Sequence, residues 1–172
     1  ISKRDELIKL TKEYGMPGLA LTEHGNLFNC ISFYRDAVKA GIVPIIGYEA
    51  YVAPDSRLNR TYAKKGEAEE DAKNGDLTLY AYHLTVLAKN RTGFDNLKSL
   101  STLAYKEGFY RKPRIDDELL DRHKDGLIVL SGCLAGKIAR YIIADDKPAA
   151  IAEIDKLRFR HGENFYLELM AH

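Results

Sequence analysis

Four residues of types that bind metal ions lie at or beside predicted strands of this sequence. Each belongs to a different apolar run: His24 follows residues 18–22, Glu49 lies within 43–52, His83 opens 83–89, and Cys133 follows 126–132. Neutral imidazole suits zinc, iron or manganese, a carboxylate suits harder ions, and a thiolate suits zinc or iron. A mixed set of this kind is typical of a centre that activates water against a phosphate ester.

Each of the four residues also has an ordinary structural explanation. His24 could cap a helix or form hydrogen bonds at the surface, and His83 could meet solvent where its strand begins. Cys133 could be a small buried hydrophobic residue. Glu49 could face solvent on an edge strand, whereas in a buried strand its charge would need a partner or a metal ion. The four residues form a site only if the fold brings their strands together.

Other candidates are weaker. Glu168 and His172 are four residues apart, a spacing that fits one face of a helix and not a strand, so we interpret both as structural. His123 and His161 lie near predicted helix ends, where the helix dipole favours histidine, and Cys30 falls on a predicted helix as a core residue. The sequence contains no glycine-rich phosphate loop and no G-x-S-x-G motif.

Composition excludes several classes of protein. The 172 residues carry 26 basic and 25 acidic side chains, for a net charge of +1, which argues against binding nucleic acid by bulk charge alone. Two cysteines cannot build a disulfide framework, so we expect an intracellular protein. No apolar run approaches the roughly 20 residues that a membrane-spanning helix needs. Because the first residue is Ile1, we expect the sequence to be part of a longer polypeptide.

Hydrophobic periodicity predicts short strands that alternate with helices. The predicted strands are 18–22, 43–52, 83–89, 126–132 and 164–169, and the predicted helices are 2–14, 26–41, 93–105, 115–123, 134–143 and 148–161. This order indicates an α/β fold with a parallel sheet, either open and doubly wound or closed into a barrel. In both cases functional groups gather at the carboxyl ends of the strands. Residues 53–78 are densely charged without an apolar stripe, which predicts a mobile loop or insertion.

Several long segments resemble one protein family. They match the PHP (polymerase and histidinol phosphatase) domain in the branch carried by the alpha subunit of bacterial DNA polymerase III. The segments are LALTEHGNLFNCISFYRDAVKAGIVPIIGYEAYVAP, YHLTVLAKNRTGFDNLKSLSTLAYKEGFYRKPRID, GLIVLSGCLAGKIAR and NFYLEL. The resemblance covers nearly the whole chain, 1–172, except residues 57–78, the predicted mobile insertion.

The resemblance implies a distorted (β/α)7 TIM-like barrel that is incomplete in this fragment. It also implies a centre for up to three divalent ions (zinc, manganese, iron or magnesium), with His24, Glu49, His83 and Cys133 among the ligands. The family's H-x-H pair and the acidic residue after it would precede Ile1, and its D-x-H pair would follow His172. More than half of the usual ligands are therefore missing from this sequence, and we expect the isolated fragment to bind metal weakly and to be inactive.

The resemblance leaves three functions open. In the first, a DNA-directed DNA polymerase acts in replication in the bacterial cytoplasm, and this domain is its metal-dependent 3′–5′ exonuclease. In the second, the domain is structural, stabilises the polymerase and docks a proofreading exonuclease subunit. The third, a stand-alone phosphatase, does not explain the polymerase-like segments. The expected partners are DNA and the other subunits of the replicative holoenzyme. Basic residues that could contact DNA phosphates, or could simply be solvated, are Lys89, Arg91, Arg111, Lys112 and Arg114.

Overall fold

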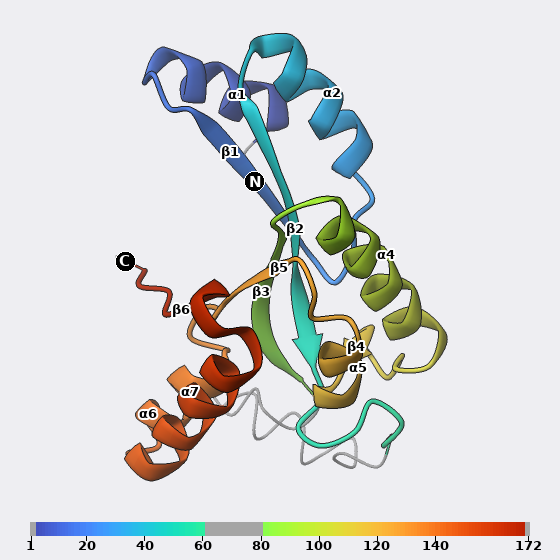
Figure 1. Cartoon of the computed structure of the whole chain (residues 1–172), viewed down its shortest axis with the longest axis vertical. Coiled ribbons are helices and arrows are strands. Elements are labelled where there is room, and N and C mark those ends of the chain that lie inside the picture. The colour runs from blue at the N-terminus through green and yellow to red at the C-terminus, as the bar shows by residue number, and fades with distance from the viewer. Residues whose placement is uncertain (1–2, 61–80, 171–172) are drawn as a thin grey trace.

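The computed structural model describes residues 3–60 and 81–170, and in this part of the chain helices surround a central sheet (Figure 1). The strands are β1 (Gly18–His24), β2 (Val43–Val52), β3 (Tyr82–Ala88), β4 (Arg114–Ile115), β5 (Leu127–Leu130) and β6 (Phe165–Tyr166). The helices are α1 (Arg4–Glu13), α2 (Cys30–Ala40), α4 (Arg91–Lys106), α5 (Asp117–Arg122), α6 (Lys137–Ile143), α7 (Lys147–His161) and the short 3-10 helix η2 (Gly162–Asn164). The alternation of strands and helices confirms the predicted α/β class.

The sheet is mixed, so the prediction of a parallel sheet is confirmed for three strand pairs and wrong for β3. Its strand order is β1-β2-β3-β5-β6, with β4 beside the end of β2. The pairs β1–β2, β2–β4 and β5–β6 are parallel, whereas β3 runs antiparallel to both β2 and β5. A parallel neighbour requires a crossover connection, usually a helix, and the sequence between 52 and 82 predicts none. Within the described residues the sheet is open, with β1 and β6 at its edges.

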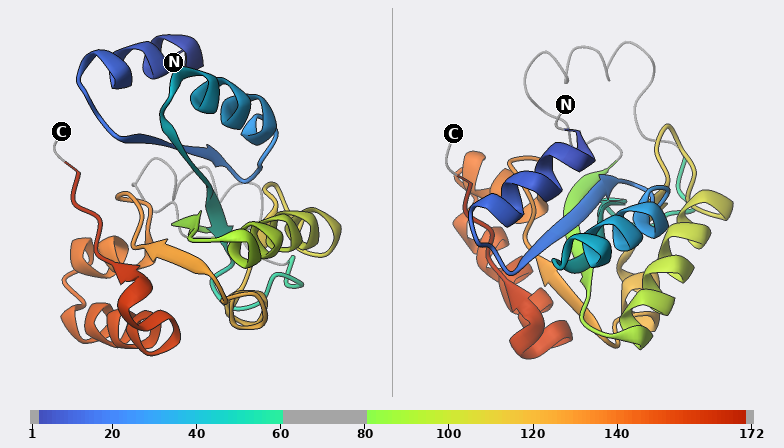
Figure 2. Two further views of the ribbon diagram at one scale, coloured as in Figure 1. Left: turned by 45° about the horizontal axis from the view of Figure 1, so that its top comes forward. Right: turned by 90° about the horizontal axis from the view of Figure 1, so that it is seen from above.

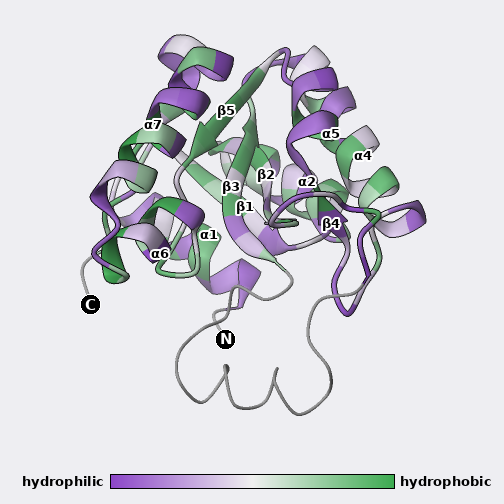
Figure 3. Cartoon of the chain, turned by 90° about the horizontal axis from the view of Figure 1, so that it is seen from below, coloured by the Kyte–Doolittle hydropathy of each residue, from purple (hydrophilic) through white to green (hydrophobic). Residues whose placement is uncertain are grey.

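The helices bury the apolar strands from several sides. Figure 2 shows α1 and α2 over one end of the sheet, with α4 on one side and α6 and α7 on the other. In Figure 3 the strands are mostly hydrophobic, while the helices carry both hydrophobic and hydrophilic residues. Fully buried side chains from β2, β3, β5 and the helices form one cluster, which includes Phe33, Tyr48, Val86, Leu97, Leu100, Leu119 and Val129. This core holds the carboxyl half of β2 and the start of β3 in place.

Several predicted boundaries shift by a few residues. Helix α2 begins at Cys30 and not at Asn26, because the Asn26 side chain instead bridges the backbone of His24 and Phe28 in the preceding turn. Strand β4 was not predicted, and it takes Ile115 away from the predicted start of α5. Strand β6 is only two residues long. In contrast, α7 matches its predicted range closely: Pro148 stands in its first turn, and Asp146, which was not predicted as a cap, accepts a hydrogen bond from the N–H of Ala149.

The predicted insertion 57–78 begins with residues that are held firmly in the fold. Arg57 is buried, and its guanidinium contacts the carboxylates of Asp116, Glu107 and Glu118 at 3.0, 2.8 and 2.9 Å. The backbone N–H of Arg57 also donates to Asp116. Burial acts to lower the pKa of Arg57, but the hydrogen bonds to these carboxylates outweigh burial and raise it. The rest of that insertion, 61–78, lies outside the described residues.

No helix in the ranges 3–60 and 81–170 is long and apolar enough to cross a membrane.

Candidate metal centre

The turn after β1 presents His24 beside Glu49. Strands β1 and β2 are parallel, and His24 is the register partner of Glu49. The chain then turns at Gly25, whose N–H donates to the carbonyl of Glu49 over 2.8 Å and whose φ is +69°. A Cβ atom at this position would lie 2.9 Å from the ring of Tyr51 and 3.0 Å from Pro113. Glycine is therefore required both by the left-handed backbone and by the close packing.

Glu49 lies at the middle of the site. Its Oε2 atom is 2.6 Å from Nε2 of His24, and its Oε1 atom is 2.9 Å from Nδ1 of His83. The side chain of Glu49 is 13% exposed, that of His83 is 23% exposed and that of His24 is 67% exposed. The carboxylate therefore lies at the floor of the site, and His24 lies at its solvent side.

The reversed direction of β3 explains how His83 reaches this end of the sheet. His83 stands near the beginning of its strand, so in a parallel sheet it would lie at the edge opposite to His24. Because β3 is antiparallel to β2, its first residues lie beside the carboxyl end of β2, where Tyr51 is paired with His83. His83 therefore reaches the predicted edge of the sheet from the amino end of an antiparallel strand, and not from the carboxyl end of a parallel strand as expected.

Cys133 completes the cluster from the loop after β5. Its Sγ atom lies 3.5 Å from Oε1 of Glu49 and 3.5 Å from Nδ1 of His83. This loop is tied to β3, because the N–H of His83 donates to the carbonyl of Ala135 over 3.0 Å. A second backbone bond, from Gly136 to the carbonyl of Cys133, closes the turn. All four sequence-predicted residues are thus brought together.

The electrostatics of the site favour a charged carboxylate and a neutral thiol in the absence of metal. Burial acts to raise the pKa of Glu49, but the hydrogen bond with His83 and the attraction of both histidines outweigh burial and lower it. Burial and the nearby Glu49 carboxylate raise the pKa of the Cys133 thiol. A bound metal ion would instead favour the thiolate form of Cys133, because a coordinating thiol is deprotonated outright.

The donor set is compatible with a divalent cation. Donor atoms of His24, Glu49 and His83 all lie within 4.8 Å of one another. Ligands on a tetrahedral zinc ion, bound at about 2.0–2.3 Å, stand roughly 3.4 Å apart. Small side-chain rotations would therefore bring these donor atoms to the spacing that a shared ion requires. Two imidazoles, one carboxylate and a thiol suit zinc or iron best, and manganese next.

Two neighbouring side chains that were not predicted to lie at the metal centre shape the site. The ring of Tyr51 packs edge-on against His83, with 5.1 Å between ring centroids. The ammonium group of Lys112 lies 5.3 Å from the centre of that ring. Tyr51 could have been found from the sequence, because it follows Glu49 by two positions in a strand and shares its face. Lys112 was named only as a candidate DNA contact, and its position beside Tyr51 could not be predicted because it comes from a distant loop.

The other histidine, glutamate and cysteine candidates in the described residues do not join the cluster. Glu168, interpreted above as structural, accepts a hydrogen bond from Thr85, the register partner of Glu49, and its N–H donates to Ser131. It therefore lies near the site without joining it. His123 pairs with Asn96. Cys30 lies in the core, as predicted, and His161 is buried near the end of α7, while His172 is outside the described residues.

The basic residues considered as DNA contacts have different surroundings. Arg114 is completely buried, and its guanidinium donates to the backbone carbonyls of Gly108, Arg57 and Asn59, so its interpretation as a DNA contact is wrong. Lys89 and Arg91 stand after the carboxyl end of β3, at the edge of the sheet opposite to the site. Lys112 and Arg111 are exposed and lie in the loop that packs against Gly25.

Among the described residues, two of the larger hollows lie near the sheet. One of about 340 Å³ is lined by Cys133, Glu168 and apolar side chains of α6 and the segment after β6, and it adjoins the cluster. The other, of about 530 Å³, is lined by Cys30, Tyr34, Ile46, Lys89 and their neighbours. The second hollow is larger, but Cys30 is the one residue of a metal-binding type in its lining, and it lies at the opposite edge of the sheet. We therefore assign the chemistry to the edge that carries Glu49.

Comparison with known proteins agrees with this geometry. The PHP domain family matches residues 1–172. The DNA polymerase III subunit alpha of Thermus aquaticus is 43% identical over 173 residues, which cover 99% of this chain and 13% of that protein. The subunit alpha of Aquifex aeolicus (strain VF5) is 44% identical over 170 residues, which cover 98% of this chain and 14% of that protein. The chain thus spans about one seventh of the length of these relatives, and it belongs to the PHP domain family.

Proposed function

We propose that this domain is a metal-dependent phosphodiesterase that removes nucleotides from the 3′ end of DNA. The observation that carries the proposal is the convergence of His24, Glu49 and His83 from three strands and of Cys133 from the loop after a fourth. In this proposal the four side chains are metal ligands. A bound divalent cation would supply hydroxide at neutral pH and stabilise the leaving oxygen.

The protein's own groups position the reaction. Each oxygen of Glu49 engages a different histidine, so one carboxylate orients both imidazole rings. Tyr51 fixes the plane of His83 from the side. The exposure of His24 leaves one side of the site open, where a phosphodiester could enter. Lys112, close to Tyr51, is placed to attract its negative charge.

We further propose that the domain belongs to an alpha subunit of a bacterial replicative DNA polymerase and works with DNA and the other holoenzyme subunits. The support is the similarity to DNA polymerase III alpha subunits over at least 98% of this chain. The same similarity supports closure of the sheet into the distorted seven-stranded barrel by further strands. The edge strands β1 and β6 are where such strands would pair.

A structural role is the second candidate, and one observation favours it. The four groups already satisfy one another through hydrogen bonds, with Glu49 accepting from both sides. A buried polar cluster that is internally satisfied can stabilise a fold without metal. In that case the domain would brace the polymerase and dock a separate proofreading exonuclease.

An exonuclease assay separates the two candidates. A full-length alpha subunit that carries this domain is incubated with a 3′-labelled single-stranded oligonucleotide and manganese or zinc, while polymerase activity is measured in parallel. We expect Glu49→Gln and His83→Gln to abolish hydrolysis and to leave DNA synthesis intact. The matched control is Glu163→Gln, at an exposed residue of η2, which should change neither activity. Hydrolysis that persists in both site variants contradicts the proposal, and absence of hydrolysis in the unchanged protein favours the structural role.

A further inference from the structure

Three exposed aromatic rings form a ladder on the surface next to the candidate metal centre. Phe28 comes from the turn between β1 and α2, Tyr105 from the last turn of α4, and Phe109 from the loop that follows α4. The ring centroids of Phe28 and Tyr105 are 6.3 Å apart, and those of Tyr105 and Phe109 are 6.1 Å apart with an interplanar angle of 26°. Rings from segments nearly 80 residues apart in the sequence thus lie next to one another.

The ladder is unusually exposed for aromatic side chains. Phe28 is 77% exposed, Phe109 is 49% exposed and Tyr105 is 40% exposed. Large apolar groups that gather on a surface mark a binding site more often than single scattered ones do. The rings form a row, so their free faces suit flat partners that stack upon them.

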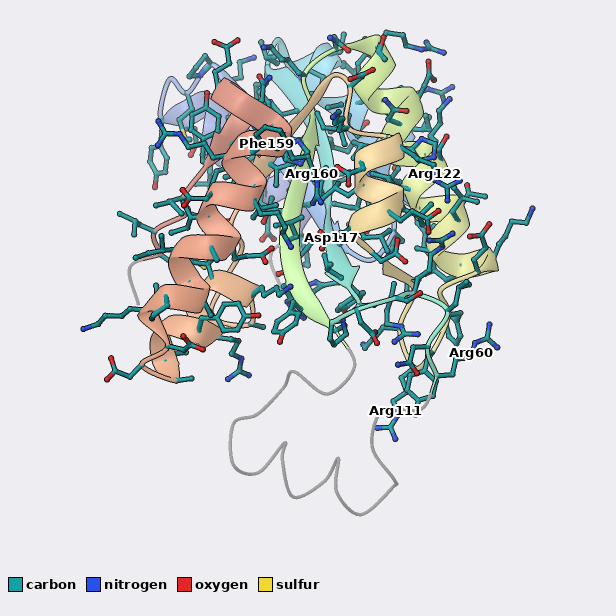
Figure 4. The ribbon with its side chains drawn as sticks, turned by 60° about the horizontal axis from the view of Figure 1, so that its bottom comes forward. Arg60, Arg111, Asp117, Arg122, Phe159 and Arg160 are labelled. Atoms are coloured by element: carbon teal, nitrogen blue, oxygen red, sulfur yellow. The ribbon has the colours of Figure 1, made fainter. Side chains whose placement is uncertain are left out.

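Basic residues lie next to two of the ladder residues in the sequence. Lys106, Arg111 and Lys112 are all exposed and come from the same stretch of chain as Tyr105 and Phe109. Figure 4 shows Arg111 and Arg60 reaching outward at the same end of the molecule.

The carboxylates of the same segments are already engaged. Glu107 binds the guanidinium of Arg57 at 2.8 Å, and Glu23 accepts hydrogen bonds from the backbone and side chain of Asn29. The local surface therefore combines aromatic faces with an excess of positive charge.

The ladder is continuous with the metal centre. The N–H of Phe28 donates to the side chain of Asn26, which in turn donates to the carbonyl of His24. From the other side, Lys112 lies over the ring of Tyr51, which packs on His83. The ladder and the candidate metal centre are therefore linked through the turn after β1 and through Lys112 and Tyr51.

We propose that Phe28, Tyr105 and Phe109 form a stacking platform for single-stranded DNA, with Arg111 and Lys112 on its phosphates. Aromatic rings interleaved with basic residues are the usual means of binding single strands without reading sequence, because every base offers a flat face. A duplex would bind less well, because its bases are already stacked and paired. The inference rests on the proposed function, and it names the form of DNA that the site receives.

The test measures DNA binding without chemistry. Fluorescence anisotropy of a labelled oligo-dT is followed with the full chain in EDTA, so that no bond is cleaved. We expect Phe28→Ala and Phe109→Ala each to weaken binding roughly tenfold, and Phe28→Trp to retain it. Lys112→Ala should reduce the slope of log affinity against log salt by about 1.

Matched controls are available on α7 and α5. Phe159 is 95% exposed and, with Arg122, lies well away from Arg111 in Figure 4. We expect Phe159→Ala and Arg122→Ala to bind oligo-dT like the unchanged chain. Equal affinity of the two ladder variants and the unchanged chain overturns the proposal and assigns the exposed rings to a protein contact. A preference for duplex DNA also overturns it.

The outcome is independent of the outcome for the metal centre. Glu49→Gln should lose metal and retain oligo-dT binding in EDTA. If the chain binds oligo-dT through Phe28 but never binds metal, the proposed hydrolysis fails and the platform stands. If it binds metal and cleaves DNA while Phe28→Ala binds normally, the platform fails and the hydrolysis stands.

Discussion

Glu49 and His83 meet diagonally across an antiparallel pair of strands, with 2.9 Å between Oε1 and Nδ1. In register, Glu49 is opposite Thr85, and His83 is opposite Tyr51. Since side chains alternate between the faces of a strand, these four residues share one face of the sheet. The contact therefore depends on both the direction and the register of β3, and a shift of one residue would turn His83 to the other face.

The thiol of Cys133 should determine which metal the site prefers. We expect Cys133→Ser to weaken zinc binding at least roughly tenfold. Even the loss of a group that only contacts a metal ligand causes a loss of that size. Manganese should be affected less, because it favours oxygen ligands. Competitive titration with the two ions measures both affinities. Cys30→Ala, at a core position away from the cluster, is the control, and equal zinc affinity for Cys133→Ser and the unchanged chain contradicts the assignment.

Gly25 should be required by the turn that presents His24. In Gly25→Ala the new methyl group meets Tyr51 and Pro113 at about 3 Å, in a backbone conformation that disfavours alanine. We expect the free energy of unfolding to fall by about 2 to 4 kcal/mol, as measured by urea denaturation. Gly15 has a similar φ of +64° with no atom of the described residues within 4 Å of a Cβ, so Gly15→Ala should cost only about 1 kcal/mol. Equal losses would show that packing against Tyr51 does not matter.

The buried contacts of Arg57 should stabilise the fold. Arg57→Ala leaves the carboxylate of Asp116 buried without its cation, and removing one partner of a buried pair costs about 3 to 5 kcal/mol. Arg122→Ala removes only an exposed pair with Glu118 and should change stability by less than about 0.5 kcal/mol. Thermal and urea unfolding of both variants measure the difference. A small effect of Arg57→Ala would mean that the segment 57–60 contributes little to the fold.

His161 should make the protein less stable in mild acid. Burial is the main cause that lowers the pKa of His161 to about 4, whereas the pKa of a histidine in the unfolded chain is about 6.5. Between these values the unfolded state binds a proton that the folded state does not, so stability falls as pH decreases from about 6.5 toward 4. The full effect is about 3 kcal/mol.

Urea unfolding at several pH values tests this contribution. His161→Leu should remove it and flatten the dependence between about pH 6.5 and 4.5. The carboxylates with lowered pKa values, Glu49 and Asp117, lose their stabilising effect only at lower pH and in both proteins. Parallel curves for the two proteins over the upper range would contradict the prediction.

The four candidate ligands could be predicted because each lies next to a recognisable apolar run. The direction of β3 could not, since a run such as HLTVLA has the same periodicity in a parallel and in an antiparallel strand. Its position beside β2 depends on long-range pairing that local patterns do not encode. The site could thus be predicted from residues near the ends of strands, although His83 lies near the beginning of its strand and not at its carboxyl end.

Other features depended on tertiary contacts that single residues do not reveal. Arg114 looks like a surface residue in the sequence, but three backbone carbonyls satisfy its guanidinium inside the fold. The two-residue strand β4 is too short to produce a periodic pattern. Phe28 and Tyr105 belong to different predicted helices, and only the folded chain places their rings together.

Metal stoichiometry tests the central claim most directly. A purified full-length alpha subunit that carries this domain is dialysed against zinc or manganese, and bound metal is measured by inductively coupled plasma mass spectrometry, with Glu49→Gln and the control Glu163→Gln treated identically. The account predicts at least one ion per subunit for the unchanged protein and for Glu163→Gln, and almost none for Glu49→Gln. An unchanged chain that binds no metal, or a Glu49→Gln variant that binds as much as the unchanged chain, would contradict it.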